Sequence, residues 1–142
     1  MQTARAYHLD PILVCAVCEQ ESGWEPFAIR WEPAFYTRYV APQNLLNETE
    51  ATMRAVSFGL MQVMGQVARE HGFKGKFLSM LCDPMAGLDI GCKVLQSKMA
   101  ARPSSSESGL LAYNGGGNPN YGKEVLARCV NYAARQNTTD AV

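Results

Sequence analysis

Apolar and polar positions repeat with helical spacing along most of the chain. Residues 11–18 are all apolar, which predicts a helix buried on every side. Asp10 directly before a proline is a typical helix start, and Gly23 is a typical stop. The helix should end between Glu21 and Gly23, so its last turn carries two carboxylates, Glu19 and Glu21.

Similar signals predict that the rest of the chain is also helical. Asn47, with Glu50 three residues on, is a typical cap, and Asp83 stands before a proline as Asp10 does. The expected helices are two short ones within residues 32–56, then residues 62–71, residues 84–100, a helix from one of Ser104 to Ser106 to the stretch 111–120, and residues 121–136. In the helix after Asp83, core positions are expected at Met85, Leu88, Cys92, Leu95 and Met99. No segment alternates convincingly like a strand, so the predicted fold class is mainly α, a compact helical domain with little or no β-sheet.

The composition is that of a globular domain. Apolar residues make up 47% of the 142 positions, and 13 basic residues balance 13 acidic ones. No long-range field therefore favours nucleic acid or an anionic membrane. The longest apolar run is too short to cross a bilayer, and the first residues lack the order of a signal peptide. We expect a single domain over residues 1–142 with no nucleic-acid partner and no integral membrane segment.

The cysteines and histidines do not suggest a metal site. The cysteines number 5, an odd count, and are expected to be reduced core thiols. Cys15 and Cys18 have CxxC spacing, but no second pair of ligands follows. His8 and His71 do not stand at metal-ligand spacing, and a peptidase or amidase would need a zinc site or a Cys-His pair. We therefore expect neither a metal nor a cofactor.

Glu21 is the candidate for acid chemistry. It lies on the helical face of Val14 and Val17, whereas Glu19 points roughly the opposite way. A carboxyl group against apolar walls keeps its proton to higher pH, as a general acid requires; the alternative is a solvated last turn without chemistry. The stretch ESGW, which holds Glu21, is followed by SFGLMQV, LAYNGGG and YGKEVLARCVNY. With these stretches in this order, the chain resembles the soluble lytic transglycosylases and their relatives, the goose-type lysozymes.

The resemblance covers most of the chain and implies a lysozyme-like fold with a cleft for the glycan strand of peptidoglycan. It implies that Glu21 is the catalytic acid, that Ser22 holds its carboxyl group or the muramyl sugar, and that the bond between N-acetylmuramic acid and N-acetylglucosamine is cleaved. The other substrate-binding residues that it implies are Gly59, Leu60, Met61, Gln62, Tyr113, Asn114 and Tyr121. The competing interpretation is core packing for Leu60, Met61 and Tyr113, and a simple helix end for the glycines at 115–117.

The type of cleavage depends on a second carboxylate. Goose-type lysozymes have an aspartate directly after GLMQV, and this chain has Met64 there, as transglycosylases typically do. This favours a lytic transglycosylase in which Glu21 acts first as acid and then as base, with formation of a 1,6-anhydromuramyl end. Hydrolysis of the same bond by a goose-type-like muramidase is the alternative.

The stretch between Glu21 and Gly59 is longer than in the soluble lytic transglycosylases, so residues of about 30–56 are predicted to be an inserted helical segment. The insert carries Glu32, Glu48 and Glu50, of which Glu32 is the main candidate for a second carboxylate. Caps and surface charges are the other interpretation of these residues. The insert also carries aromatic side chains that could form a sugar-stacking wall, namely Trp31, Phe35, Tyr36 and Tyr39.

A non-catalytic glycan-binding or structural module is a further alternative, against which the presence of Glu21 argues. The protein is expected to be a monomer whose partner is the glycan strand of peptidoglycan. It is expected to be made in the cytoplasm and to act on the cell wall after release, in phage lysis or on a virion, or else to be an exported domain whose signal has been removed.

Overall fold

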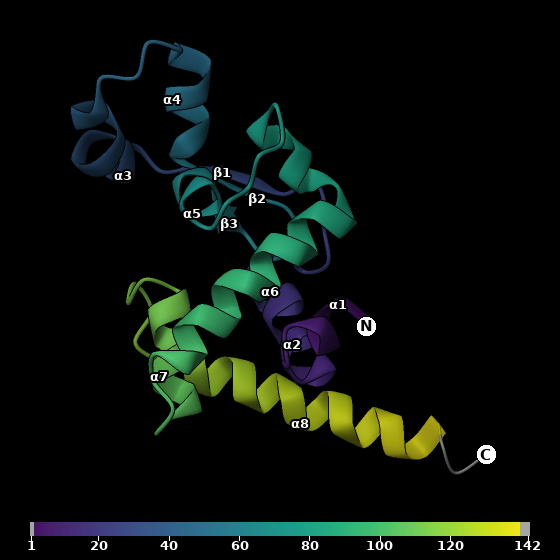
Figure 1. Ribbon diagram of the computed structural model, residues 1–142. Coiled ribbons are helices and arrows are strands. Elements are labelled where there is room, and N and C mark those ends of the chain that lie inside the picture. Colours follow the sequence, from purple (N-terminus) through teal and green to yellow (C-terminus); the bar gives the residue numbers. More distant parts are fainter. Residues whose placement is uncertain (1, 140–142) are drawn as a thin grey trace. The chain divides into compact units, whose positions relative to one another are not determined.

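The computed structural model describes residues 2–139 (Figure 1). The chain forms two compact units. The central unit is Glu21–Gly91, and the terminal unit joins the chain up to Gln20 with the chain from Cys92 onward. A single domain over residues 1–142 stays a prediction. Residues 1 and 140–142 lie outside the described part of the chain.

Helices build the terminal unit. The short helix α1 (Gln2–Ala6) precedes α2 (Pro11–Ser22), which starts at the predicted proline and ends within the predicted range. The second half of α6 (Pro84–Ala100) follows, then α7 (Ser106–Tyr113) and α8 (Tyr121–Thr139). Helix α7 packs against α8 (Figure 1). Fully buried side chains of α2, α6, α7 and α8 include Val17, Leu95, Leu110 and Val125.

The polar residues predicted as helix caps do begin their helices. Their side chains satisfy backbone N–H groups that have no partner within the first turn. In each case a side-chain oxygen of the cap accepts from a backbone N–H: Asp10 from Ile12 at 2.9 Å, Asn47 from Glu50 at 2.9 Å, Asp83 from Ala86 at 2.9 Å, and Ser105 from Ser108 at 3.3 Å. The predicted helix starts are therefore confirmed for α2, α4 (Glu48–Arg54), α6 and α7.

A small antiparallel sheet is the centre of the central unit. Its strands are β1 (Ile29–Trp31), β2 (Val56–Phe58) and β3 (Val63–Met64), with β2 in the middle. Residue Phe58 is opposite Ile29 on one side and Val63 on the other. All of β2 is buried, whereas all of β1 is exposed. Helix α5 (Gly65–Glu70) continues directly from β3 and lies beside the sheet (Figure 1).

The predicted inserted segment is helical after β1. It contains α3 (Pro33–Phe35), the π-helix η1 (Tyr36–Val40), the 3-10 turn η2 (Ala41–Gln43) and α4. Its small apolar core consists of Val40, Ala51 and Ala55, with Phe35, Tyr36 and Leu45 packed against it.

Aromatic pairs form within this segment. The rings of Phe35 and Tyr39 lie together, with centroids 4.9 Å apart. The rings of Trp31 and Tyr36 are 5.5 Å apart. Trp31 and Tyr39 keep about half of their surface in water, at 45% and 48%, so the segment offers aromatic surface to solvent.

The structure corrects several sequence-based expectations. Helix α5 begins at Gly65 rather than Gln62, because Val63 and Met64 pair with β2 instead. Met85 is 67% exposed and is not a core residue, since it stands on the first turn of α6. The strands, α1 and the 3-10 turn η3 (Leu78–Cys82) were not predicted. Each strand is too short to show an alternating pattern.

Candidate active site

Glu21 stands on the last turn of α2 and is partly exposed. The next residue, Ser22, donates a hydrogen bond from its hydroxyl to the backbone carbonyl oxygen of Leu60 at 2.9 Å. After Ser22 the backbone turns sharply, with positive φ at Gly23 and Trp24. Two of the stretches that carried the resemblance, ESGW and SFGLMQV, are therefore joined directly within the central unit.

The turn that follows β2 depends on its glycine. Gly59 has φ +70, and a Cβ there would meet the Leu81 carbonyl oxygen at 2.5 Å. The Gly59 N–H donates to the Ala28 carbonyl oxygen at 2.8 Å. A side chain is excluded both by the backbone conformation and by the neighbouring backbone. The backbone that approaches Gly59 closely is that of Leu81 in the same protein.

The side chain of Gln62 closes the same turn. Its amide nitrogen donates to the carbonyl oxygens of Ala28 at 2.9 Å and of Gly59 at 3.0 Å. The residue itself has φ 46, an uncommon conformation that these two bonds stabilise. Gln62 therefore holds the turn together. The sequence analysis predicted a contact with a sugar for this residue and did not predict this structural role.

Leu60 and Met61 are core residues in the central unit. Met61 is fully buried, and Leu60 is 8% exposed. The Met61 side chain lies against Gly91, where a Cβ would meet its sulfur at 2.4 Å. Core packing was the competing interpretation for both residues, and their burial agrees with it.

The remaining predicted substrate contacts belong to the terminal unit. Tyr113 is the last residue of α7 and is partly exposed, whereas Tyr121 is the first residue of α8 and is buried. The Asn114 side-chain oxygen accepts a hydrogen bond from the Asn118 N–H at 2.8 Å. This bond holds the loop in which Gly115 and Gly116 have positive φ.

A polar network around Arg128 was not predicted. The Arg128 guanidinium donates to Glu19 at 2.6 Å and to the Gln20 side-chain oxygen at 2.7 Å. The Gln20 amide donates to Glu124 at 2.9 Å, and Glu124 also accepts from Asn118 at 2.9 Å. The two residues before Glu21 are thus tied to α8. The sequence indicates this network only through Glu124 and Arg128, which stand one helical turn apart within YGKEVLARCVNY.

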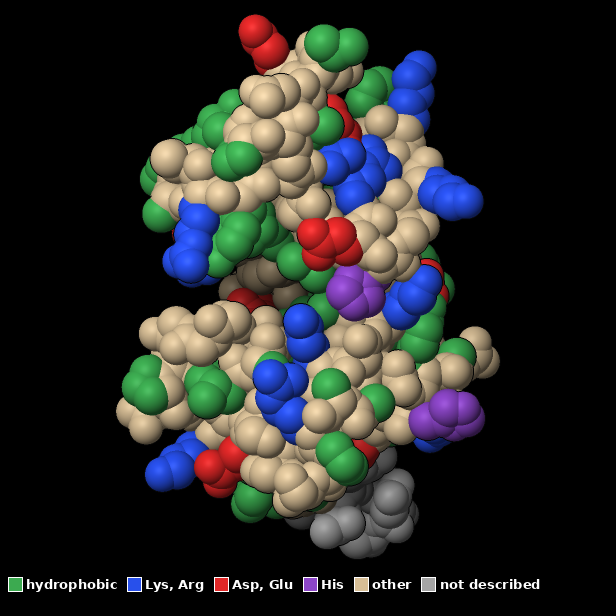
Figure 2. Space-filling view, turned by 60° about the vertical axis from the view of Figure 1, so that its left-hand side comes forward, with side chains coloured by type: hydrophobic (Ala, Val, Ile, Leu, Met, Phe, Trp, Pro, Cys, Tyr) green, Lys and Arg blue, Asp and Glu red, His purple; other side chains and the backbone are tan. Residues whose placement is uncertain are grey.

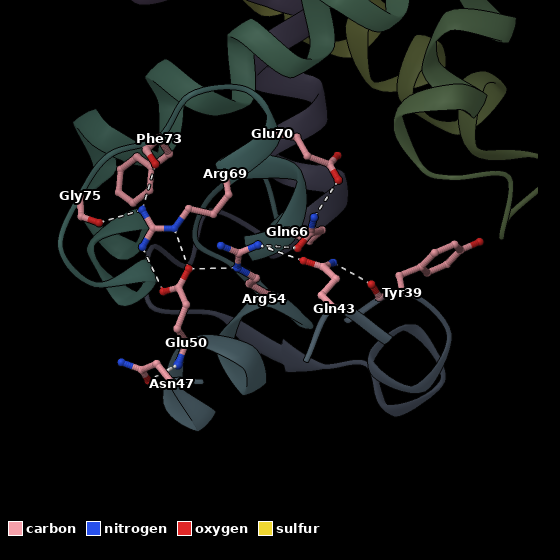
Figure 3. A network of polar contacts seen from close by, with 10 residues as sticks. All are labelled: Tyr39, Gln43, Asn47, Glu50, Arg54, Gln66, Arg69, Glu70, Phe73 and Gly75. Atoms are coloured by element: carbon pink, nitrogen blue, oxygen red, sulfur yellow. Dashed lines mark hydrogen bonds and ion pairs between the residues drawn. The ribbon is translucent and has the colours of Figure 1, made fainter. Parts of the chain in front are cut away.

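Two of the three candidate second carboxylates, Glu32 and Glu50, pair with arginines. Glu32 pairs with Arg30 at 2.5 Å, and Glu48 is exposed on the first turn of α4. Glu50 accepts hydrogen bonds from Arg69 at 2.8 and 3.0 Å and from Arg54 at 3.1 Å (Figure 3). The Arg69 bonds, more than those of Arg54, hold the pKa of Glu50 below its ordinary value, against the opposing effect of partial burial.

Arg69 connects Glu50 to the following loop. Its guanidinium also donates to the carbonyl oxygens of Phe73 and Gly75, both at 2.8 Å (Figure 3). Arg54 continues the network to Gln43 and Gln66, both at 3.2 Å. These contacts attach the inserted segment to α5 and give Glu50 a structural role.

Charged side chains of both signs lie on the face that Figure 2 draws. Figure 2 shows Lys and Arg side chains scattered over the face that it draws. Within residues 2–139, His, Cys, Asp and Glu side chains do not gather in groups of three that could hold a metal ion. In the same part of the chain, no helix combines the length and the apolar character needed to cross a membrane.

The mainly helical fold with its small sheet is that of a lysozyme-like domain. A family model described as the transglycosylase SLT domain matches residues 1–128, and the chain belongs to that family. The protein is therefore a peptidoglycan lytic transglycosylase, with peptidoglycan as its substrate. Comparisons with curated proteins and with solved structures gave no match.

Proposed function

We propose that the enzyme cleaves the β-1,4 bond between N-acetylmuramic acid and N-acetylglucosamine without using water, with Glu21 as acid and then as base. The observation that carries this proposal is the anchoring of the last turn of α2, where the Ser22 hydroxyl binds the Leu60 carbonyl at 2.9 Å. This bond holds the backbone beside Glu21 in place. A catalytic carboxyl group needs such a fixed position to meet one glycosidic oxygen.

The proposed reaction needs one carboxyl group. Glu21 gives its proton to the glycosidic oxygen, and the bond from that oxygen to C1 of the muramyl sugar breaks. The substrate's own acetamido oxygen stabilises the positive charge at C1. The Glu21 carboxylate then takes the proton of the C6 hydroxyl, whose oxygen bonds to C1 and closes the 1,6-anhydro ring. Glu21 ends protonated, as it began.

The alternative, hydrolysis by a muramidase, needs a carboxylate that activates water. Met64 stands where goose-type lysozymes have an aspartate. Glu50 is held by two arginines and Glu32 by one. The hydrogen bonds from Arg69 hold the pKa of Glu50 below its ordinary value, so that its carboxylate is a weaker base. These pairings support a mechanism without a second carboxylate.

The experiment is mass spectrometry of soluble products from purified peptidoglycan. The enzyme should release muropeptides one water lighter than reducing ones, and Glu21→Gln should release none. Glu25→Gln is the matched control, because Glu25 is an exposed carboxylate four positions on. Reducing ends from the unchanged enzyme would refute the anhydro mechanism, and Glu32→Gln would then test for the missing base.

The proposed setting is the cell wall, reached after release from the cytoplasm, as in phage lysis or from a virion, or after export. The proposed assembly is a monomer. Fractionation of producing cells with an antibody to the protein tests the setting, and light scattering of the purified protein tests the assembly.

A further inference from the structure

The terminal unit contains a basic pocket next to the predicted sugar contacts. The pocket has a volume of about 400 Å³, and its wall includes Lys98, Arg102, Ser108, Gly115 and Gly116. This volume lies in the usual range for small-ligand sites. The pocket therefore has room for part of a substrate molecule.

The two cations of the pocket have no counter-ion in the part of the chain that the structure describes. Among residues 2–139, the ion pairs involve other basic residues, and neither Lys98 nor Arg102 takes part in one. None of the described residues that line the pocket is acidic. A pair of uncompensated cations on one concave wall attracts an anion, and the planar guanidinium of an arginine suits a carboxylate in particular.

The end of α6 approaches α7 closely at Gly109, beside the pocket. Gly109 of α7 lies so close to Met99 that a Cβ would meet its sulfur at 2.6 Å. Lys98 is the neighbour of Met99 in the chain, and Arg102 follows the end of α6, where its N–H donates to the Met99 carbonyl oxygen at 3.0 Å. The two cations thus stand on a packed junction of two helices.

The pocket lies next to residues for which the resemblance to lytic transglycosylases implies a contact with the glycan. Tyr113 and Asn114 end α7, and Gly115 and Gly116, which come next, line the pocket. Each muramyl sugar carries a peptide stem with free carboxylates, and an extended peptide spans about 3.5 Å per residue. A glycan at Tyr113 and Asn114 would bring its stem within reach of the pocket.

We infer that the pocket of Lys98 and Arg102 binds a carboxylate of the peptide stem, so that the enzyme recognises glycan strands that still carry stems. This inference rests on the proposed contact of Tyr113 and Asn114 with the glycan. The binding adds affinity for intact peptidoglycan and leaves the chemical step unchanged.

The test compares two substrates and two double variants. The substrates are intact sacculi and glycan strands whose stems an amidase has removed, which leaves the carboxylate of the muramyl lactyl group. The pocket variant is Lys98→Gln with Arg102→Gln. The matched control is Lys74→Gln with Arg5→Gln, one lysine and one arginine that are exposed outside the pocket.

The pocket variant should lose about three- to tenfold in kcat/KM on intact sacculi, the size expected for one or two exposed ion pairs, and should equal the unchanged enzyme on peptide-free strands. The control should lose nothing on either substrate. Equal loss on both substrates would overturn the inference, since the anion would then be the lactyl carboxylate or the variant would be damaged. An unchanged rate on both would overturn it as well.

A parallel Glu21→Gln variant separates this inference from the proposed function. If Glu21→Gln abolishes turnover on both substrates while the pocket variant shows no substrate preference, only the stem inference fails. If Glu21→Gln stays active while the pocket variant loses activity on sacculi alone, only the assignment of Glu21 fails.

Discussion

The hydroxyl of Ser22 donates to the carbonyl oxygen of Leu60 at 2.9 Å. This hydrogen bond connects the end of α2 to the turn after β2, across a large separation in sequence. Ser22 follows Glu21 directly, so the bond determines where the backbone of the proposed acid stands. The role of Ser22 that this geometry supports is to hold the acid through the backbone.

Ser22→Ala should therefore lower both stability and turnover. The partly buried Leu60 carbonyl would lose its donor, which costs about 1–2 kcal/mol of unfolding free energy. The urea midpoint measures this loss, and the rate of product release from sacculi measures the effect on Glu21. Ser22→Thr, which keeps a hydroxyl, should retain most of both. An unchanged urea midpoint in Ser22→Ala would show that the bond contributes nothing.

Gly59→Ala should be among the most destabilising single changes in the central unit. The positive φ alone costs about 1–2 kcal/mol, and the clash of a Cβ 2.5 Å from the Leu81 oxygen adds about 1–3 kcal/mol. Gly23→Ala is the matched control, because Gly23 has φ +59 with nothing within 4 Å. In thermal or urea unfolding, Gly23→Ala should lose only the stability that the positive φ costs. Equal losses in the two variants would contradict the close contact with Leu81.

Stability should depend on pH through Glu50. Its pKa in the folded protein is lowered from 4.5 by the Arg69 hydrogen bonds, so its ionised form stabilises the fold above that ordinary value. The contribution is lost as pH falls through the lowered folded pKa. Glu50→Gln should be less stable near neutral pH by about 1–3 kcal/mol and should lose less stability on acidification. Urea titrations at several pH values test this, and parallel curves for both proteins would exclude it.

Arg128 should affect turnover more than stability. It holds Glu19 and Gln20, the residues before Glu21, but its side chain and that of Glu19 are 36% and 37% exposed, and such pairs contribute less than about 1 kcal/mol. Arg128→Gln should reduce the rate on sacculi by about tenfold, since small displacements of a catalytic group are costly. Lys123→Gln on the same helix is the control. A rate loss matched by an equally large loss of stability would argue against positioning.

The cysteines should react slowly in the native protein. All five are thiols, and burial raises the pKa of Cys15, Cys82 and Cys129 above the ordinary value of 9.0. Since the thiolate is the reactive form, alkylation at about pH 8 should be much slower in the folded protein than in denaturant. Mass spectrometry after brief iodoacetamide treatment measures this. Equal rates in both conditions would show that these thiols are accessible.

The local elements were predictable from sequence, and the contacts between distant residues were not. The helix starts were predictable from Asp10, Asn47 and Asp83, because a cap binds backbone N–H groups only a few residues further on. The strands escaped prediction because two or three residues cannot show alternation, and their pairing depends on partners far away in the chain. Glu21 was predicted to be the acid from its place in a buried helix and from the resemblance, and this assignment stays a prediction.

The supporting contacts of the candidate site depend on long-range structure. Nothing near Ser22 in the sequence indicates Leu60, and nothing near Gln20 indicates Arg128. The contact of Gln62 with a sugar was predicted from the resemblance, and an amide can bind a saccharide. Its two bonds to backbone carbonyls could be seen only once Ala28 had been placed beside the turn.

The edge strand β1 has a consequence for handling the protein at high concentration. Its apolar side chains, Ile29 at 64% and Trp31 at 45%, are open to water, and an unpaired strand edge can recruit another chain. The strand has only 3 residues, and the ion pair of Arg30 with Glu32 places charges along it. A short, charged edge is a poor template for further strands, so the aromatic surface can remain exposed without seeding aggregates.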